Sequence, residues 1–198
     1  MSTTETTGGH QSPPRMRADA QRSHARLLAA ATAAFAENGA DAPLEDIARR
    51  AGVGIGTLYR HFPTRLDLQA AVFRSQVDSV CARAQDPLDG TPAEQAFAGW
   101  IKALAGYLVT KRGLSHALIS SLGRDSELIT SCWIAMRDTA ERLLVRAQEA
   151  GVVRPDVTAM DVMRLVHGIV VSTEQAPGQA DRLLSLMLDG LRSRPADS

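Results

Sequence analysis

The sequence predicts an all-α protein, and three observations support this prediction. Apolar residues recur at the 3.6-residue spacing of helices along most of the chain, and no stretch alternates apolar and polar residues for long enough to predict a sheet. Turn-forming residues separate the helical segments. The second of these segments is a short helix that starts near residue 43. The others lie at about 17–38, 55–61, 64–84, 92–111, 114–121, 126–149, 157–174 and 179–193.

The first two predicted helices have recognisable start and stop residues. Gly39 ends the first helix, because glycine readily takes the left-handed conformation that closes a helix. The second starts near Pro43, whose fixed φ suits a first turn, with Glu45 and Asp46 in its positive N-terminal turn. The apolar stripe of the first helix consists of Leu27, Leu28, Ala31, Ala34 and Phe35.

The middle of the chain carries a further helix start and a linker. Thr64 and Asp67 have the spacing of a capping box, which opens a helix that reaches about residue 84. Residues 85–92, QDPLDGTP, are dense in Pro, Gly and Asp, and we expect a linker there.

Composition and charge exclude several classes of protein. The 22 basic and 22 acidic residues balance, and no apolar run approaches the roughly 20 residues of a membrane span, so we expect no membrane association. Residues 1–14 are rich in Ser, Thr, Gly and Pro, which predicts a disordered lead rather than a secretory signal. Cys81 and Cys132 lie in apolar helical surroundings, which favours free thiols over a disulfide. We therefore expect a cytoplasmic location.

The segment AGVGIGTLYRHF, residues 51–62, carries glycines at positions 52, 54 and 56 and raises the question of a phosphate site. A dinucleotide fingerprint needs G-x-G-x-x-G between a buried strand and a long helix. Here the spacing is G-x-G-x-G, the preceding residues have a helical pattern, and no Walker Lys-Ser/Thr follows. The segment therefore fails as a nucleotide site, and we expect no cofactor.

Two short helices joined by a tight glycine turn instead predict a helix-turn-helix. Ala48 is small where the helices cross, Gly52 permits the turn, and Leu58 is apolar on the inner face. A generic helical hairpin explains these three residues equally well. A helix that lies in the major groove of DNA explains in addition the side chains off the core face, which are Thr57, Tyr59, Arg60 and His61.

Residues 26–68, RLLAAATAAFAENGADAPLEDIARRAGVGIGTLYRHFPTRLDL, resemble the DNA-binding domain of tetracycline-repressor (TetR)-type regulators. The strongest match, AGVGIGTLYRHFPTRLDL, is similar to that family's pattern A-G-V-S-x-G-T-L-Y-x-H-F-x-x-K-x-x-L. The resemblance implies a homodimer of nine-helix chains. After the disordered lead that composition predicts at 1–14, it implies a helix-turn-helix DNA-binding domain at 15–63 and a helical ligand-binding and dimerisation domain at 64–198.

The resemblance implies candidate DNA contacts as well. The phosphate-contacting Lys of the family is Arg65 here, which keeps the charge. Arg15 and Arg17 are further candidates for contacts to phosphates or the minor groove, with solvated surface charge as the alternative. The family's recognition helix falls on Ile55, Gly56, Thr57, Tyr59, Arg60 and His61.

Two positions depart from the family pattern. Gly54 replaces the usual Ser before the recognition helix, which removes a capping hydroxyl and a phosphate contact. Pro43-Leu44 replaces the usual Thr at the start of the second helix, which removes another contact. A helical module whose DNA binding has decayed therefore stays open as an alternative.

The C-terminal part carries apolar residues with polar handles, which predict a pocket for a small apolar or aromatic effector. An ordinary hydrophobic core is the competing interpretation for each of them. The candidate ligand-binding residues are Phe73, Trp100, Leu104, Tyr107, His116, Trp133, Met136 and His167.

The last two predicted helices carry apolar stripes that predict a two-fold interface between copies of the chain. Packing against the chain's own core is the alternative, and the need for paired half-sites favours the dimer. The candidate interface residues are Val162, Leu165, Val166, Ile169, Val170, Leu183, Leu186 and Met187.

These features predict a ligand-responsive transcriptional regulator, with a repressor favoured, that binds a palindromic operator on double-stranded DNA as a homodimer and releases it when a small effector binds. An enzyme is the alternative. Ser115 and His116 are adjacent in GLSHA, but the second glycine of a nucleophile elbow and a preceding strand are missing. The five histidines lack metal-ligand spacing, so we expect neither a catalytic nor a metal site.

Overall fold

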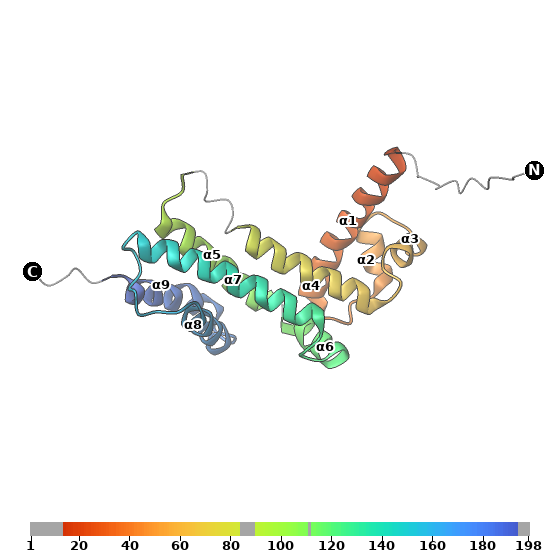
Figure 1. The fold of residues 1–198 in the computed structure, drawn as a ribbon. Helices are drawn as coiled ribbons and strands as arrows, with labels where there is room; N and C mark the ends of the chain where they lie inside the picture. Colours follow the sequence, from red (N-terminus) through yellow and green to blue (C-terminus); the bar gives the residue numbers. More distant parts are fainter. Residues whose placement is uncertain (1–13, 84–89, 111, 194–198) are drawn as a thin grey trace, which may run out of the picture.

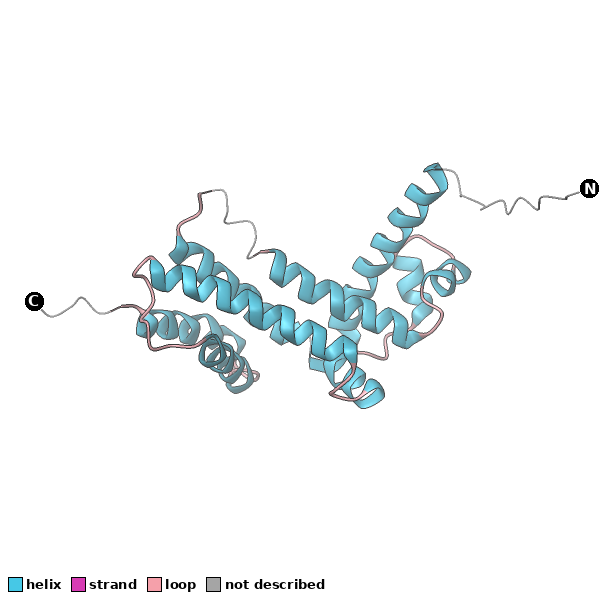
Figure 2. Ribbon diagram, in the orientation of Figure 1, coloured by secondary structure: helices cyan, strands magenta, loops and turns pink. Residues whose placement is uncertain are grey.

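The structure, a computed structural model, describes residues 14–83, 90–110 and 112–193 (Figure 1). These residues form nine α-helices and one short 3₁₀ helix, with no β-strand among them (Figure 2). The all-α prediction and the expected number of helices are confirmed. The helices are α1 Pro14–Asn38, α2 Leu44–Arg50, α3 Ile55–His61, α4 Arg65–Ala82, α5 Ala93–Thr110, α6 Arg112–Leu122, α7 Glu127–Glu149, α8 Ala159–Ser172 and α9 Ala180–Leu191.

The described helices form two parts joined by α4. In Figure 1, α1, α2 and α3 gather near the N-terminal end, whereas α5, α7, α8 and α9 lie toward the C-terminal end. Helix α4 packs against α1 and also against α5, α6 and α7. It is therefore the element through which the two parts are connected.

Two predicted helix starts differ from the structure. Helix α1 begins at Pro14, so this residue belongs to the helix, and the other residues of the expected lead, 1–13, lie outside the described residues. Pro43 is the N-cap of α2 rather than its first helical residue, because its ψ of 131° is extended. Of the expected linker, residues 85–89 also lie outside the described residues.

Two glycines close the turns around α2, as the sequence predicts. Gly39 after α1 has φ +74° and Gly52 after α2 has φ +66°, a region that L side chains rarely adopt. The Thr64–Asp67 capping box is also present: Thr64 N donates to Asp67 Oδ2 at 2.9 Å, and Asp67 N donates to Thr64 Oγ1 at 3.1 Å. These turns and caps fix where α2, α3 and α4 begin.

The hydrophobic core is continuous from the N-terminal helices into the rest of the chain. Leu27, Ile47 and Leu58 from three helices are fully buried in the N-terminal part. Trp100, Ile101 and Leu118 are fully buried in the other part. Both parts thus have well-packed interiors, which gives their surface side chains defined positions.

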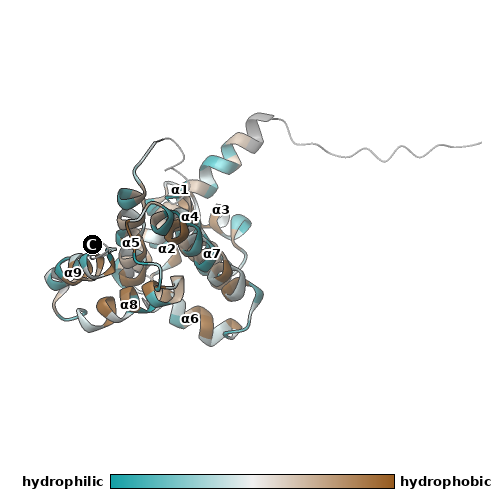
Figure 3. Ribbon diagram, turned by 60° about the vertical axis from the view of Figure 1, so that its left-hand side comes forward, coloured by the Kyte–Doolittle hydropathy of each residue, from teal (hydrophilic) through white to brown (hydrophobic). Residues whose placement is uncertain are grey.

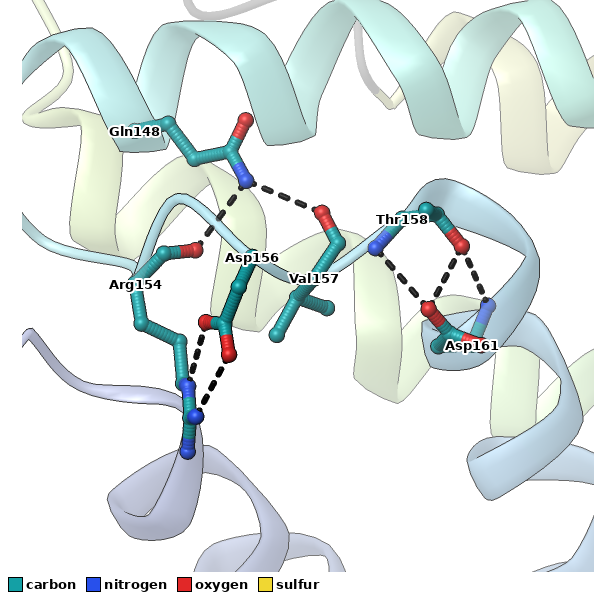
Figure 4. Close-up of polar contacts among 6 residues, drawn as sticks. All are labelled: Gln148, Arg154, Asp156, Val157, Thr158 and Asp161. Atoms are coloured by element: carbon teal, nitrogen blue, oxygen red, sulfur yellow. Dashed lines mark hydrogen bonds and ion pairs between the residues drawn. The ribbon is translucent and has the colours of Figure 1, made fainter.

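The loop between α7 and α8 is held by side-chain hydrogen bonds (Figure 4). Gln148 Nε2 donates to the carbonyl oxygens of Arg154, at 3.1 Å, and Val157, at 3.0 Å. A second capping box then opens α8, in which Thr158 N donates to Asp161 Oδ2 at 3.0 Å. The hydrogen bonds from the Thr158 side chain and backbone lower the pKa of Asp161 below its usual value. Helix α8 therefore has a fixed start and direction.

Candidate nucleic-acid interface and ligand cavity

Helix α3 has one buried face and one exposed face. Leu58 is buried, and Phe62, directly after the helix, is buried as well. Tyr59 is 46% exposed, and Arg60 and Ile55 are also exposed. The predicted recognition helix therefore projects Tyr59 and Arg60 outward, as a helix that enters a DNA groove must project some of its polar side chains.

Arg60 provides an available positive charge on this face. Among the described residues it has no ion pair and no side-chain hydrogen bond, so its guanidinium group is open to an external anion. Three other arginines of the N-terminal helices are paired with acids on the surface. These pairs are Arg22–Asp19, Arg49–Asp46 and Arg50–Glu37.

His61, at the end of α3, packs against α1. Its ring centroid lies 5.7 Å from that of His24 in an edge-to-face arrangement, and His24 also lies 5.0 Å from Phe62. Partial burial, followed by the charges of His24 and Arg60, holds the pKa of His61 below its usual value. The sequence analysis missed His24, because helical periodicity does not show which residue of another helix will be its neighbour.

Open space surrounds the start of α3. Gly54 is the N-cap, with φ −72° and ψ 152°, and no side chain caps the helix. A Cβ atom added at Gly54 or at Gly56 would meet no heavy atom within 4 Å. The backbone at this end of α3 is therefore accessible to a large partner.

Arg65 and Gln69 of α4 are bound to the turn between α1 and α2. Arg65 Nη1 donates to the carbonyl oxygen of Ala42 at 2.7 Å and to that of Ala40 at 3.3 Å. Gln69 Nε2, on a buried side chain, donates to the same Ala40 oxygen at 2.9 Å. Arg65, for which the family resemblance implies a phosphate contact, thus has its Nη1 atom bound within the protein.

A cavity of about 600 Å³ lies among helices α4 to α8. Its inner wall consists of buried, mostly apolar side chains, which include Phe73, Leu104, Tyr107, Leu108, Ser115 and Met136. Burial, followed by the nearby Cys132 and Cys81, raises the pKa of Tyr107, so its hydroxyl stays protonated. Exposed residues surround the mouth, among them Arg124, Thr130, Trp133, Arg164 and His167.

Six of the eight predicted ligand residues line this cavity, and two do not. Trp100 is fully buried in the core of α5 away from the cavity. His116 is exposed on α6, because Ser115 and Ile119, one turn apart, occupy the cavity face and the next residue points about 100° away. The residues that line it as expected are Phe73, Leu104, Tyr107, Trp133, Met136 and His167.

Helix α8 contributes four cavity residues besides the expected His167. The cavity residues of α8 recur at helical spacing, a pattern that can be recognised in the sequence alone. Arg124, in the loop before α7, has no such pattern around it. The missed residues of α8 are Met160, Met163, Arg164 and Gly168.

Comparison with known proteins assigns both parts of the chain. Residues 27–72 match the family described as bacterial regulatory proteins, tetR family, and residues 92–193 match the C-terminal domain of SbtR-like transcriptional regulators. The chain belongs to the TetR family. It is accordingly a DNA-binding transcription regulator of the helix-turn-helix type.

Other TetR-family proteins resemble the chain over most of its length. The crystal structure of SCO0520 from Streptomyces coelicolor is 35% identical, with a TM-score of 0.77, and covers 86% of this chain and 99% of its own. A TetR regulator from Mycobacterium vanbaalenii is 34% identical, with a TM-score of 0.73 and coverage of 89% and 99%. The HTH-type transcriptional regulator Rv2250c of Mycobacterium tuberculosis is 33% identical over 82% of this chain and 84% of its own.

Three of the residues expected in a TetR dimer interface are core residues of the single chain, which corrects the sequence analysis. Val162, Val166 and Val170 recur every four residues on the face of α8 that packs inward, and each is at most 3% exposed. They have no surface left for a second copy. Five expected residues stay exposed or half-buried, namely Leu165, Ile169, Leu183, Leu186 and Met187.

Arg15 and Arg17 lie in the first turns of α1. Among the described residues of this TetR chain, no cluster of three or more His, Cys, Asp or Glu residues is found that could hold a metal ion. None of the described helices has an apolar stretch long enough to cross a bilayer. Neither Cys81 nor Cys132 takes part in a disulfide within the described residues.

Proposed function

We propose that this TetR-family chain is a repressor that binds a palindromic operator as a homodimer and is released when a small molecule enters its cavity. The observation that carries the proposal is the combination of an exposed face on α3 with a cavity of about 600 Å³ among helices α4 to α8. We assign DNA binding to residues 15–63, and ligand binding and dimerisation to residues 64–198.

The composition of the α3 surface supports the DNA contacts. Arg60 offers an available guanidinium fork, which suits phosphate or base edges, and Tyr59 offers a hydroxyl next to it. Thr57 and His61 of the same helix are half-buried. We assign Arg15 and Arg17, at the start of α1, to contacts with the phosphates of the DNA backbone, because an N-terminal segment next to a recognition helix can follow the duplex.

Exposed leucines on α8 and α9 support the dimer. Leu165 is 46% exposed and Leu186 is 55% exposed, which leaves two large apolar side chains in water in the single chain. Ile169 on α8 and Leu183 and Met187 on α9 are half-buried. A two-fold interface formed by these residues would pair two α3 helices for two half-sites.

The contacts of α4 provide a route between the cavity and the DNA surface. Phe73 lines the cavity, and one helical turn away Gln69 binds the Ala40 carbonyl in the turn before α2. Gly113 of α6 faces the same turn, since its Cβ would lie 3.9 Å from Ala40 N. A ligand that favours a different position of α4 or α6 would therefore shift the α3 helices out of register with the operator.

Substitutions on α3 test the DNA part of this proposal. Arg60→Ala and Tyr59→Ala should each weaken binding to a duplex selected from random DNA by about 5- to 100-fold, the usual cost of losing one specific contact. Arg142→Ala, on an exposed position of α7, is the matched control and should leave affinity unchanged. Unaltered binding by both α3 variants would contradict the proposal.

A further inference from the structure

We infer that the cavity takes an amphipathic anion, an organic acid with an apolar body and one carboxylate at the mouth. This inference rests on the proposed function, because it names the ligand class of the same effector cavity. It goes beyond an apolar or aromatic ligand by assigning a charge and an orientation to the molecule.

The charge of the lining residues points to an anion. Arg124 and Arg164 both line the cavity, and no aspartate or glutamate is among its lining residues. A cationic ligand would meet two like charges without a counter-charge, whereas a carboxylate would be attracted by both. The cavity wall therefore discriminates by the sign of the ligand's charge.

The two arginines lie at the mouth and not in the interior. Both are exposed side chains, as is His167 on α8, whereas Phe73 and Met136 on the inner wall are buried. Figure 3 shows hydrophobic residues on α6, α7 and α8, which enclose the cavity together with α4 and α5. A molecule with a polar head and an apolar body would thus enter with its body first.

Arg124 and Arg164 form no ion pair with an acid of the described chain, although the charge of Arg164 contributes to the lowered pKa of Asp161. The acid nearest to Arg164 along α8 is Asp161, whose Oδ2 already accepts hydrogen bonds from Thr158 N at 3.0 Å and from Thr158 Oγ1 at 2.6 Å. The guanidinium groups are consequently available to a ligand carboxylate, which they can bind in a bidentate manner.

Calorimetric titration of the purified full chain with matched probes tests the inference. The probes are decanoate, 1-decanol and decylamine, which share an apolar chain and differ in the charge of the head group, and 2-naphthoate with 2-naphthylmethanol as a ring pair. We expect at least one acid to bind about tenfold or more tightly than its alcohol, and decylamine to bind most weakly.

Variants then assign the preference to the two arginines. In Arg124→Gln/Arg164→Gln the acid should bind within about twofold of its alcohol, with alcohol binding retained as proof of an intact cavity. Arg142→Gln, exposed on α7 outside the cavity, should keep the wild-type preference. Because the comparison of acid with alcohol on the wild-type chain needs no variant, it decides the matter even if the double variant does not fold.

Three results would overturn the inference: equal binding of acid and alcohol, an acid preference that survives in the folded double variant, or no binding of either acid. The titration contains no DNA, so its outcome is separate from that of the proposed function. A chain that selects a palindrome but shows no acid preference would retain the proposed function and lose this inference.

Discussion

Arg65 Nη1 donates a 2.7 Å hydrogen bond to the carbonyl oxygen of Ala42, across the boundary between α4 and the turn before α2. The sequence resemblance implies a phosphate contact for this arginine, but the structure shows its nitrogen holding the protein backbone. With Gln69 on the neighbouring Ala40 oxygen, it joins the helix that lines the cavity to the part that carries α3. A ligand-induced shift of α4 would reach α3 through these hydrogen bonds.

Removing the Gln69 contact should destabilise the fold. In Gln69→Leu the Ala40 carbonyl loses its buried amide donor, and we expect the free energy of unfolding to fall by about 1–2 kcal/mol. Urea denaturation measures this change. Gln95→Leu, exposed on α5, is the matched control and should stay within about 0.5 kcal/mol of wild type.

Arg65 should contribute little to the salt dependence of DNA binding. Since its Nη1 is bound to two carbonyl oxygens, Arg65→Met should leave the slope of log affinity against log salt unchanged. Arg60→Met should reduce that slope by about one unit if Arg60 binds a phosphate. A reduction of about one unit in the Arg65 variant would show that this residue does reach the DNA backbone.

The stability of the chain should fall at mildly acidic pH because of His61. Burial, and then the charges of His24 and Arg60, place its folded pKa below the usual 6.5, so the unfolded chain binds the proton more readily. The resulting stabilisation is complete above pH 6.5 and is lost as the pH falls through the folded pKa. Urea unfolding at about pH 7.5 and 5.5 should show a smaller decrease for His61→Gln than for wild type. An equal decrease would remove His61 as the cause.

A serine at position 54 should strengthen the start of α3. The backbone of Gly54 already has an N-cap conformation, and a Cβ atom there meets nothing within 4 Å. We expect Gly54→Ser to raise the free energy of unfolding by a few tenths of a kcal/mol, roughly, and to tighten DNA binding about two- to fivefold through the added hydroxyl. Gly54→Ala, which adds the Cβ without the hydroxyl, should give neither gain. Matching gains in both variants would exclude capping as the reason.

Charge on the exposed apolar face of α9 should prevent self-association. Leu186→Asp would place an unpaired carboxylate in the proposed interface, and we expect sedimentation to show a monomer at concentrations where wild type is a dimer. Val145→Asp, at a similarly exposed position of α7, should remain dimeric. If Leu186→Asp stays a dimer and Val145→Asp does not, the interface lies on α7 instead.

The boundaries of α2, α3 and α4 were predictable because the sequence signals that mark them are local. Gly39 and Gly52 mark turns, Thr64 and Asp67 form a capping box, and Leu58 follows the spacing of a buried face. Each of these depends on residues within a few positions along the chain. The start of α1 at Pro14 differs from the prediction because the apolar stripe begins only at Leu27 and gives no boundary before it.

The cavity and the interface were less predictable because α8 packs on several sides. Periodicity identifies apolar faces of a helix but does not show what each face contacts. Val166 packs into the core, Leu165 faces away from it, and Met163 lines the cavity, although all three are apolar neighbours in sequence. The acceptor of Arg65 lies 23 residues away along the chain, which no local pattern reveals.

Selection of bound duplexes from random DNA, read by sequencing, shows whether two α3 helices read paired half-sites. We expect inverted repeats whose half-site centres are one helical turn of about 10 base pairs, or a multiple of it, apart. The same selection with Tyr59→Ala/Arg60→Ala should enrich no sequence. Enrichment of no motif by the wild-type chain, or of the same motif by the double variant, would contradict a dimer that reads DNA through α3.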